Sequence, residues 1–203
     1  MTCAPTERRP GWLQGRLLPG RLAASGFAAF LVAILALSGG ALPAQARDLN
    51  LPAFFGHWQG TGISETEDSI YFRVTSRDMD VRISAADQGG FRIVWTTVQR
   101  QSGAADNPNA ERKTTEMLFL PTGRKNVWKA QTAADPMTGT YAWATLQGAT
   151  LSINTFVIQG NGDFRLHVYK RTITGLGMEL DFIAFADGEA ARTVSARLVK
   201  IGN

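Results

Sequence analysis

The sequence is almost without cysteine and histidine. Its 203 residues include one cysteine, Cys3, and two histidines, His57 and His167. A single thiol excludes an internal disulfide framework and any metal site that requires two thiolates. A zinc site would need both histidines together with carboxylates, and the two lie far apart in the chain. We therefore expect no bound metal ion.

Local signatures of catalysis are also missing. The chain contains no Gly-x-Ser-x-Gly elbow, no His-x-x-x-His pair and no Gly-x-x-x-x-Gly-Lys-Ser/Thr phosphate loop. Neither histidine has a nucleophile that the sequence places beside it, as a hydrolytic triad would require. We assign no catalytic residue; the sequence leaves enzymatic activity open and favours a protein without it.

After residue 46 the sequence shows no helical periodicity. Short runs of residues there alternate between apolar and polar with period two. Met79, Val81 and Ile83, for example, alternate with polar residues. This pattern predicts about ten or eleven strands, near residues 55–63, 69–76, 78–85, 91–99, 112–120, 126–132, 140–147, 150–158, 163–173, 177–185 and 190–201.

Turn-forming residues separate these runs, which favours antiparallel pairing of sequence neighbours. The clearest turns are Asp87-Gln88-Gly89-Gly90, Pro121-Thr122-Gly123, Gln147-Gly148 and Gly160-Asn161-Gly162-Asp163. The fold class predicted is all-β, an antiparallel up-and-down barrel of about ten strands, because closure removes exposed strand edges. A two-sheet sandwich is the alternative.

The first 46 residues are typical of a signal peptide. Four arginines (Arg8, Arg9, Arg16, Arg21) precede residues 22–46, which carry no charge and contain the apolar block 26–37. The segment ends in Ala44-Gln45-Ala46, which predicts cleavage before Arg47 and a single β-barrel domain over 47–203. An uncleaved anchor is the alternative. The protein is expected to be periplasmic or secreted, by the general secretory route or, through Arg8-Arg9, the twin-arginine route.

Most of the net positive charge of the chain lies in this predicted signal peptide, the leader. The whole chain has 21 Lys and Arg against 17 Asp and Glu, a net charge of +4. Without four leader arginines and one glutamate, 17 basic and 16 acidic residues remain, a net charge of +1. This balance predicts no nucleic-acid partner, and no membrane span remains after cleavage.

The first strand of the mature chain resembles the entrance of calycin-type barrels. Gly56, Trp58, Gly60 and Gly62 match the Gly-x-Trp-x-Gly-x-Gly of nitrobindin-like haem barrels, and lipocalins share the Gly-x-Trp. Uncharacterised exported bacterial proteins are similar in this opening. In lipocalin-like barrels a basic side chain of the last strand packs over this tryptophan, a role that the resemblance assigns here to Arg197.

The resemblance to nitrobindin-like proteins also raises the question of haem. Those proteins ligate the iron through a histidine near the chain end, and no histidine follows His167 here. The alternation of its strand predicts that His167 shares the outer face with Arg165 and Tyr169, opposite the apolar residues Phe164, Leu166 and Val168. No cofactor is therefore expected, and haem held by His167 or His57 is kept as an alternative.

Aromatic residues offer the best candidate for a binding site. Phe91 shares the parity of Trp95, and Tyr141 that of Trp143, so each pair points to one face of a strand. These four residues are the expected lining of a pocket for a small apolar or aromatic ligand, bound without catalysis. The alternatives are an interaction module of the cell envelope, with a packed core and a protein partner, and a nitrobindin-like haem protein.

Overall fold

The computed structural model describes residues 48–66, 74–100, 111–132 and 134–203, and the predicted signal peptide lies outside them. The described elements are η1 (Leu51–Phe54), β1 (Gly56–Thr66), β2 (Val74–Ala85), η2 (Asp87–Gly89), β3 (Phe91–Arg100), β4 (Glu111–Pro121), β5 (Val127–Ala130), β6 (Tyr141–Gln147), β7 (Thr150–Ile158), β8 (Phe164–Thr174), β9 (Gly177–Ala186) and β10 (Glu189–Gly202). No helix in these four segments has the length and apolar character needed to cross a bilayer.

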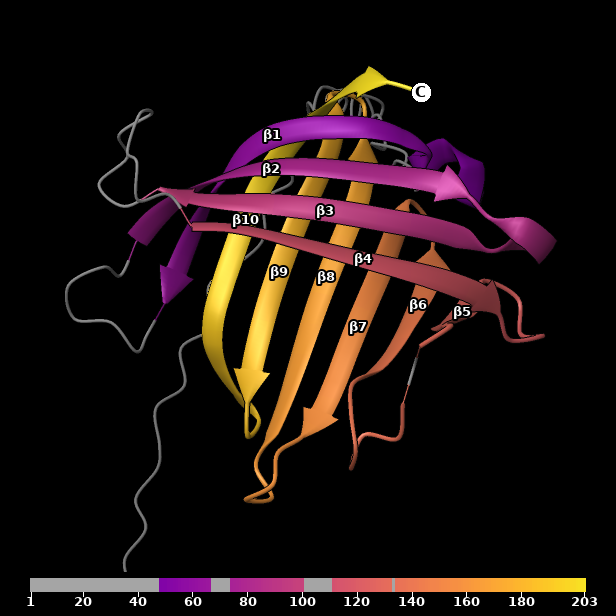
Figure 1. The fold of residues 1–203 in the computed structure, drawn as a ribbon. Coiled ribbons are helices and arrows are strands. Elements are labelled where there is room, and N and C mark those ends of the chain that lie inside the picture. The colour runs from indigo at the N-terminus through magenta and orange to yellow at the C-terminus, as the bar shows by residue number, and fades with distance from the viewer. Residues whose placement is uncertain (1–47, 67–73, 101–110, 133) are drawn as a thin grey trace, which may run out of the picture. The chain divides into compact units, whose positions relative to one another are not determined.

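The ten strands form a closed antiparallel barrel. Each strand pairs with its sequence neighbour, and β1 closes the ring by pairing with β10. In Figure 1, β1–β4 cross in front of the more upright β7–β10. The all-β prediction and the preference for a barrel over a sandwich are confirmed, and the architecture fits a calycin-like fold.

One strand is longer than predicted. The sequence suggested two strands, 69–76 and 78–85, where the structure has the single strand β2 from Val74 to Ala85. Arg77 has no turn-forming character, so the alternation runs through it and the backbone stays extended. Residues 69–73 lie outside the described part of the chain.

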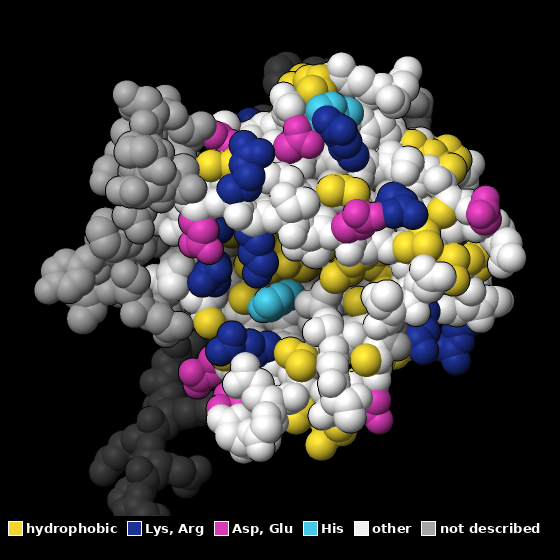
Figure 2. Space-filling view, viewed as in Figure 1, with side chains coloured by type: hydrophobic (Ala, Val, Ile, Leu, Met, Phe, Trp, Pro, Cys, Tyr) yellow, Lys and Arg dark blue, Asp and Glu magenta, His cyan; other side chains and the backbone are white. Residues whose placement is uncertain are grey.

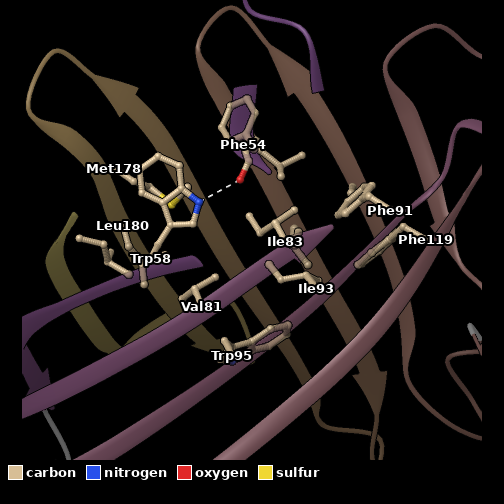
Figure 3. Packing of buried hydrophobic residues seen from close by; sticks show 14 of the residues in the cluster. Phe54, Trp58, Val81, Ile83, Phe91, Ile93, Trp95, Phe119, Met178 and Leu180 are labelled. Atoms are coloured by element: carbon tan, nitrogen blue, oxygen red, sulfur yellow. Dashed lines mark hydrogen bonds between the residues drawn. The ribbon is translucent and has the colours of Figure 1, made fainter. Parts of the chain in front are cut away.

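One end of the barrel, which we call the floor, is filled by large apolar side chains. Trp58 is 4% exposed, and its indole Nε1 donates a hydrogen bond to the carbonyl of Phe54, 2.9 Å away (Figure 3). Helix η1 thereby covers the barrel end beside β1. The apolar alternation of the strands and the hydrogen-bonded indole together stabilise a packed core here.

A second aromatic group fills the same end beside β3–β5. The rings of Phe91 and Phe119 stack with centroids 4.9 Å apart, and Trp128 meets Phe91 edge-on at 5.7 Å. Trp128 also donates from Nε1 to the carbonyl of Gly89 in the turn before β3. Figure 3 shows Phe91 and Phe119 beside Ile83 and Ile93, and Trp128 belongs to the same buried cluster, so this half of the barrel is packed.

Candidate functional site

The other half of the barrel contains a cavity of about 660 Å³. Its lining comes from the starts of β2, β4, β8 and β10 and the ends of β3 and β9, which place it away from η1. This volume lies within the range of small-molecule pockets, roughly 300–1,000 Å³. The barrel is therefore filled at the floor and hollow towards the opposite end, which we call the mouth.

Aromatic side chains form one wall of the cavity. The ring of Tyr169 lies between those of Trp95 and Phe182, with centroid distances of 5.3 Å and 4.6 Å. His167 meets Phe182 edge-on at 5.6 Å. Aliphatic residues complete the apolar lining, among them Met79, Val81, Met117, Leu180 and Val194. Such a wall of tilted rings offers an apolar surface to a ligand.

Cationic side chains are the second component of the lining. Figure 2 shows Lys and Arg side chains around a hollow in this face of the protein, with a histidine inside it. The described lining holds one carboxylate, Glu111, against five cations, namely Arg77, Lys113, Arg165, Arg171 and Arg192. The cavity is therefore electropositive, although residues 47–203 together carry a net charge of only +1.

Arg171 is the most buried of these cations. It projects from β8, is 1% exposed, and its guanidinium lies over the rings of Trp95 and Tyr169 at 5.4 Å and 5.6 Å. Among the described residues no group accepts a hydrogen bond from its Nε or Nη1. Burial lowers the pKa of Arg171 to about 10, so the guanidinium stays charged at neutral pH.

Two neighbouring groups are held neutral at neutral pH. Burial raises the pKa of the Tyr169 hydroxyl, against an opposing effect of the Arg171 charge. Burial also lowers the pKa of His167, and the positive charges of Lys113, Arg165 and Arg192 lower it further. The cavity thus combines an uncharged imidazole and phenol with fixed guanidinium charges.

The orientation of β8 is the main correction to the sequence prediction. Arg165, His167 and Tyr169 were placed on the outer face, whereas the structure turns them into the cavity. Their apolar neighbours Phe164, Leu166 and Val168 lie on the outer face instead, where Phe164 contacts Phe156 of β7. The prediction was wrong because it assumed that the apolar face of every strand meets the interior.

A signal for this inversion was present in the sequence. The hairpin between β8 and β9 pairs Arg171 with Leu180 and Tyr169 with Phe182. Paired residues share a face, and Leu180 alternates with the charged Glu179 and Asp181, so the Leu180 side is the interior. Counting outward from this turn would have placed Arg171 inside, a residue that the sequence analysis missed.

The four predicted pocket residues separate in the structure. Trp95 lines the cavity, as expected, but Phe91 is fully buried in the packed floor. Tyr141 and Trp143 lie on the outer face of β6 with ring centroids 5.9 Å apart, because Ala142 and Ala144 are the inward residues of that strand. The pocket therefore has one of the predicted aromatic residues and gains Tyr169 and Phe182.

The basic residue over the floor tryptophan also differs from the expectation. Arg197 lies on the outer face of β10, where its side chain is 85% exposed and 3.8 Å from the Glu179 carboxylate. Lys200 occupies the expected role, with Nζ 5.8 Å from the ring centre of Trp58. Lys200 pairs with Trp58 across the sheet and so shares its face, whereas Arg197 pairs with Thr61. The glycines of the motif, Gly56, Gly60 and Gly62, lie in β1.

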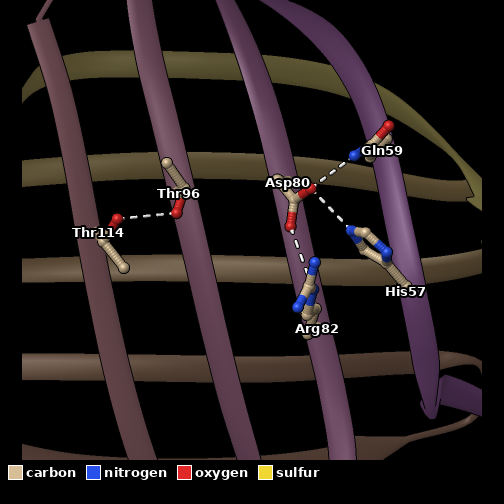
Figure 4. A network of polar contacts seen from close by, with 6 residues as sticks. All are labelled: His57, Gln59, Asp80, Arg82, Thr96 and Thr114. Carbon is tan, nitrogen blue, oxygen red and sulfur yellow. Dashed lines mark hydrogen bonds and ion pairs between the residues drawn. The ribbon is translucent and has the colours of Figure 1, made fainter.

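His57 belongs to a polar network outside the barrel (Figure 4). Its Nε2 lies 2.7 Å from Asp80, which also accepts a hydrogen bond from Gln59 and pairs with Arg82. Partial burial raises the pKa of Asp80, but these hydrogen bonds and charges lower it by more. His57 therefore has a structural partner and does not reach the cavity.

The positions of the possible ligands decide which metal or haem sites this geometry could form. In the described segments no three His, Cys, Asp or Glu side chains gather closely enough to hold a metal ion. Of the two haem-ligand candidates, His167 lines the cavity and His57 does not. A neutral imidazole is the form that ligates haem iron, so His167 is the residue that fits this role.

Comparisons with known proteins are limited to structural likeness. No protein-family model matches the chain, and no curated protein matches it in sequence. An S-type phycobiliprotein lyase from Guillardia theta aligns with 72% of this chain and 88% of its own, at 12% identity and a TM-score of 0.33. An N-terminal dehydratase from the difficidin assembly line aligns with 85% and 83%, at 11% identity and a TM-score of 0.22. Likeness at this level carries no argument about function.

Proposed function

We propose that this protein is an exported binding barrel that holds a small organic molecule in its cavity without catalysis. The observation that carries the proposal is the cavity of about 660 Å³ beside the aromatic wall of Trp95, Tyr169 and Phe182. The alternative, an interaction module of the cell envelope, was expected to have a packed core. A cavity of this size in one half of the barrel does not fit that expectation. The export itself rests on the signal-peptide pattern.

Two dyes that fluoresce when buried test this proposal, the anionic anilinonaphthalene sulfonate and the uncharged phenylnaphthylamine. Substitution of Ala184 by tryptophan would fill part of the cavity, because Ala184 lines it from β9. We expect at least one dye to bind the wild type and to lose most of its affinity for Ala184→Trp. Titration by fluorescence measures both affinities.

The matched control is Ile183→Trp, which places the same side chain on the opposite face of β9. Ile183 does not line the cavity and pairs with Val168, a residue of the outer face. Its affinity for the dye should equal that of the wild type. Binding of neither dye, or equal binding by the wild type and Ala184→Trp, would contradict the proposal.

Haem is a second candidate occupant, favoured by the inward position of His167. We propose that the His167 imidazole and the lining cations would hold haem through its iron and its carboxylates, and that the iron would supply any redox or gas-binding chemistry. Haem added to the purified protein should give a Soret band that shifts in His167→Ala and not in His57→Ala. An identical band in the wild type and both variants would exclude this role for His167.

A further inference from the structure

We propose that the cavity selects organic acids, with the acid group of the ligand seated on Arg171 and the apolar body against the aromatic wall. This inference rests on the proposed binding function and deepens it by naming the chemical class of the ligand. It depends on three observations: a buried cation with two unpartnered nitrogen atoms, an excess of positive charge in the lining, and apolar surface next to both.

The hydrogen-bonding state of Arg171 is the first observation. A guanidinium has five N–H donors and no acceptor, and buried charges are normally paired with an opposite charge. Arg171 is 1% exposed, lines the cavity, and has no acceptor for Nε or Nη1 within the described chain. A carboxylate, sulfonate or phosphate entering the cavity would supply acceptors that match the guanidinium fork.

The aromatic contacts of Arg171 do not replace such a partner. The rings of Trp95 and Tyr169 lie 5.4 Å and 5.6 Å from its Cζ and stabilise the charge through their faces. They accept no conventional hydrogen bond, and the Tyr169 hydroxyl stays protonated because burial raises its pKa. The rings hold the guanidinium in place and leave its donors available to a ligand.

The charge of the remaining lining is the second observation. Arg77, Lys113, Arg165 and Arg192 line the mouth half of the cavity, and Glu111 is the one carboxylate among the described lining residues. Burial lowers the pKa of Arg77, and repulsion from the charge of Arg192 lowers it further, against the opposing effect of the Glu111 carboxylate. A bound anion reduces that repulsion, whereas a cationic ligand would add to it.

The third observation is the apolar surface beside Arg171. Trp95, Tyr169 and Phe182 form a continuous ring wall, with Leu180 and Val81 also in the lining. A small inorganic anion would leave this surface without a partner, whereas an acid with an aromatic or aliphatic body covers it. The chemistry of the cavity is therefore that of an amphipathic acid.

The two dyes test this inference because they share an aromatic body and differ by one sulfonate. Wild-type protein should bind the anionic anilinonaphthalene sulfonate about tenfold or more tightly than uncharged phenylnaphthylamine, the effect of one charge-assisted hydrogen-bonded pair. Arg171→Met should lose most of this preference. Arg197→Met makes the same change at an 85% exposed outer position and should keep the preference in full.

A second measurement needs no variant and covers the case in which Arg171→Met fails to fold. Dodecanoate should displace the bound dye from the wild type at about one tenth of the concentration of dodecanol, which has the same chain and no charge. Equal displacement by the two, or a preference for the anionic dye that persists in a folded Arg171→Met, would overturn the inference. Equal binding of both dyes inside the cavity would overturn it too and leave the proposed function standing, whereas binding of neither dye overturns both.

Discussion

At the scale of single residues, the chemistry of the cavity depends on Arg171. Its guanidinium lies fully inside the barrel, charged at neutral pH, with two nitrogen atoms that have no partner among the described groups. Burial of an unpaired charge lowers the stability of a folded protein. A residue that costs stability in the free protein and offers donors to a ligand is typical of a binding site.

Replacing Arg171 by methionine should therefore stabilise the free protein. We expect the free energy of unfolding to rise by about 1–3 kcal/mol, because an unsatisfied buried group is exchanged for an apolar side chain of similar length. Urea denaturation without ligand measures this change. Arg197→Met, on the outer face, should change the value by less than about 0.5 kcal/mol. A lower stability of Arg171→Met would show that the guanidinium is satisfied in the free protein.

We expect His167 to make binding at the same site depend on pH. Burial and the charges of Lys113, Arg165 and Arg192 lower its pKa, so the imidazole is neutral in the free protein at neutral pH. Tyr169 and Phe182 contact its ring, and neither carries a charge there. An anion bound nearby favours the imidazolium and raises the pKa of His167, so binding takes up a proton.

The expected result is tighter binding of the sulfonate dye at lower pH. The sulfonate stays ionised throughout, so a several-fold gain in affinity between about pH 8 and about pH 5.5 would report the protonation of His167. Fluorescence titration at a series of pH values measures the effect. His167→Gln keeps a polar side chain without a charge, and its affinity should be independent of pH. A pH dependence that survives this substitution would assign the proton to another group.

At the scale of elements, barrel closure depends on how closely β1 approaches β10. A Cβ atom on Gly60 would overlap the carbonyl oxygen of Arg197, and one on Gly62 would lie 2.7 Å from that of Ser195. These two glycines belong to the motif that resembles calycin entrances. This close approach explains why the motif has glycine at both positions, since larger residues would separate the first and last strands.

Substitution of Gly60 by alanine is expected to destabilise the barrel severely. We expect a loss of about 3 kcal/mol or more, because the added methyl group must displace the backbone of β10. Gly160→Ala is the control, since nothing lies within 4 Å of a Cβ at that turn position. It should change stability by less than about 0.5 kcal/mol. Thermal and urea unfolding compare the two, and equal stability would refute this account of closure.

Strand positions were predictable and strand faces were less so. Period-two alternation located β3, β4 and β6–β10 to within a few residues, because backbone pleating imposes that pattern on any half-buried strand. The face of β8 did not follow, since both of its faces meet partly covered surroundings. The inward face contacts a polar cavity, and the outward face packs on apolar neighbours such as Phe156.

At the scale of the whole barrel, we expect the packed half and the hollow half to have different roles. Phe91 is fully buried at the floor against Phe119 and Trp128. Phe182 lines the cavity and already borders open space. Stability should therefore come mainly from the floor, and binding from the cavity.

Alanine substitutions at these two phenylalanines should separate the two roles. Phe91→Ala creates a new void in a packed core and should cost about 3–5 kcal/mol, with dye affinity retained in the folded protein. Phe182→Ala enlarges an existing cavity, so we expect a cost of about 1–2 kcal/mol and a clear loss of dye affinity. Urea unfolding and dye titration on both variants measure the contrast. Equal losses of stability would contradict the division of the barrel.

The sequence by itself determined the all-β class and the order of the strands, because both follow from local alternation and turn residues, whereas the motif around Trp58 was recognised only by its resemblance to calycin entrances. Only the tertiary structure decided where the barrel is hollow and which side chains meet there. Closure brings Trp95 of β3 over Arg171 of β8, residues far apart in the chain. No local pattern encodes that distance, since it is set by the register of all ten strands together.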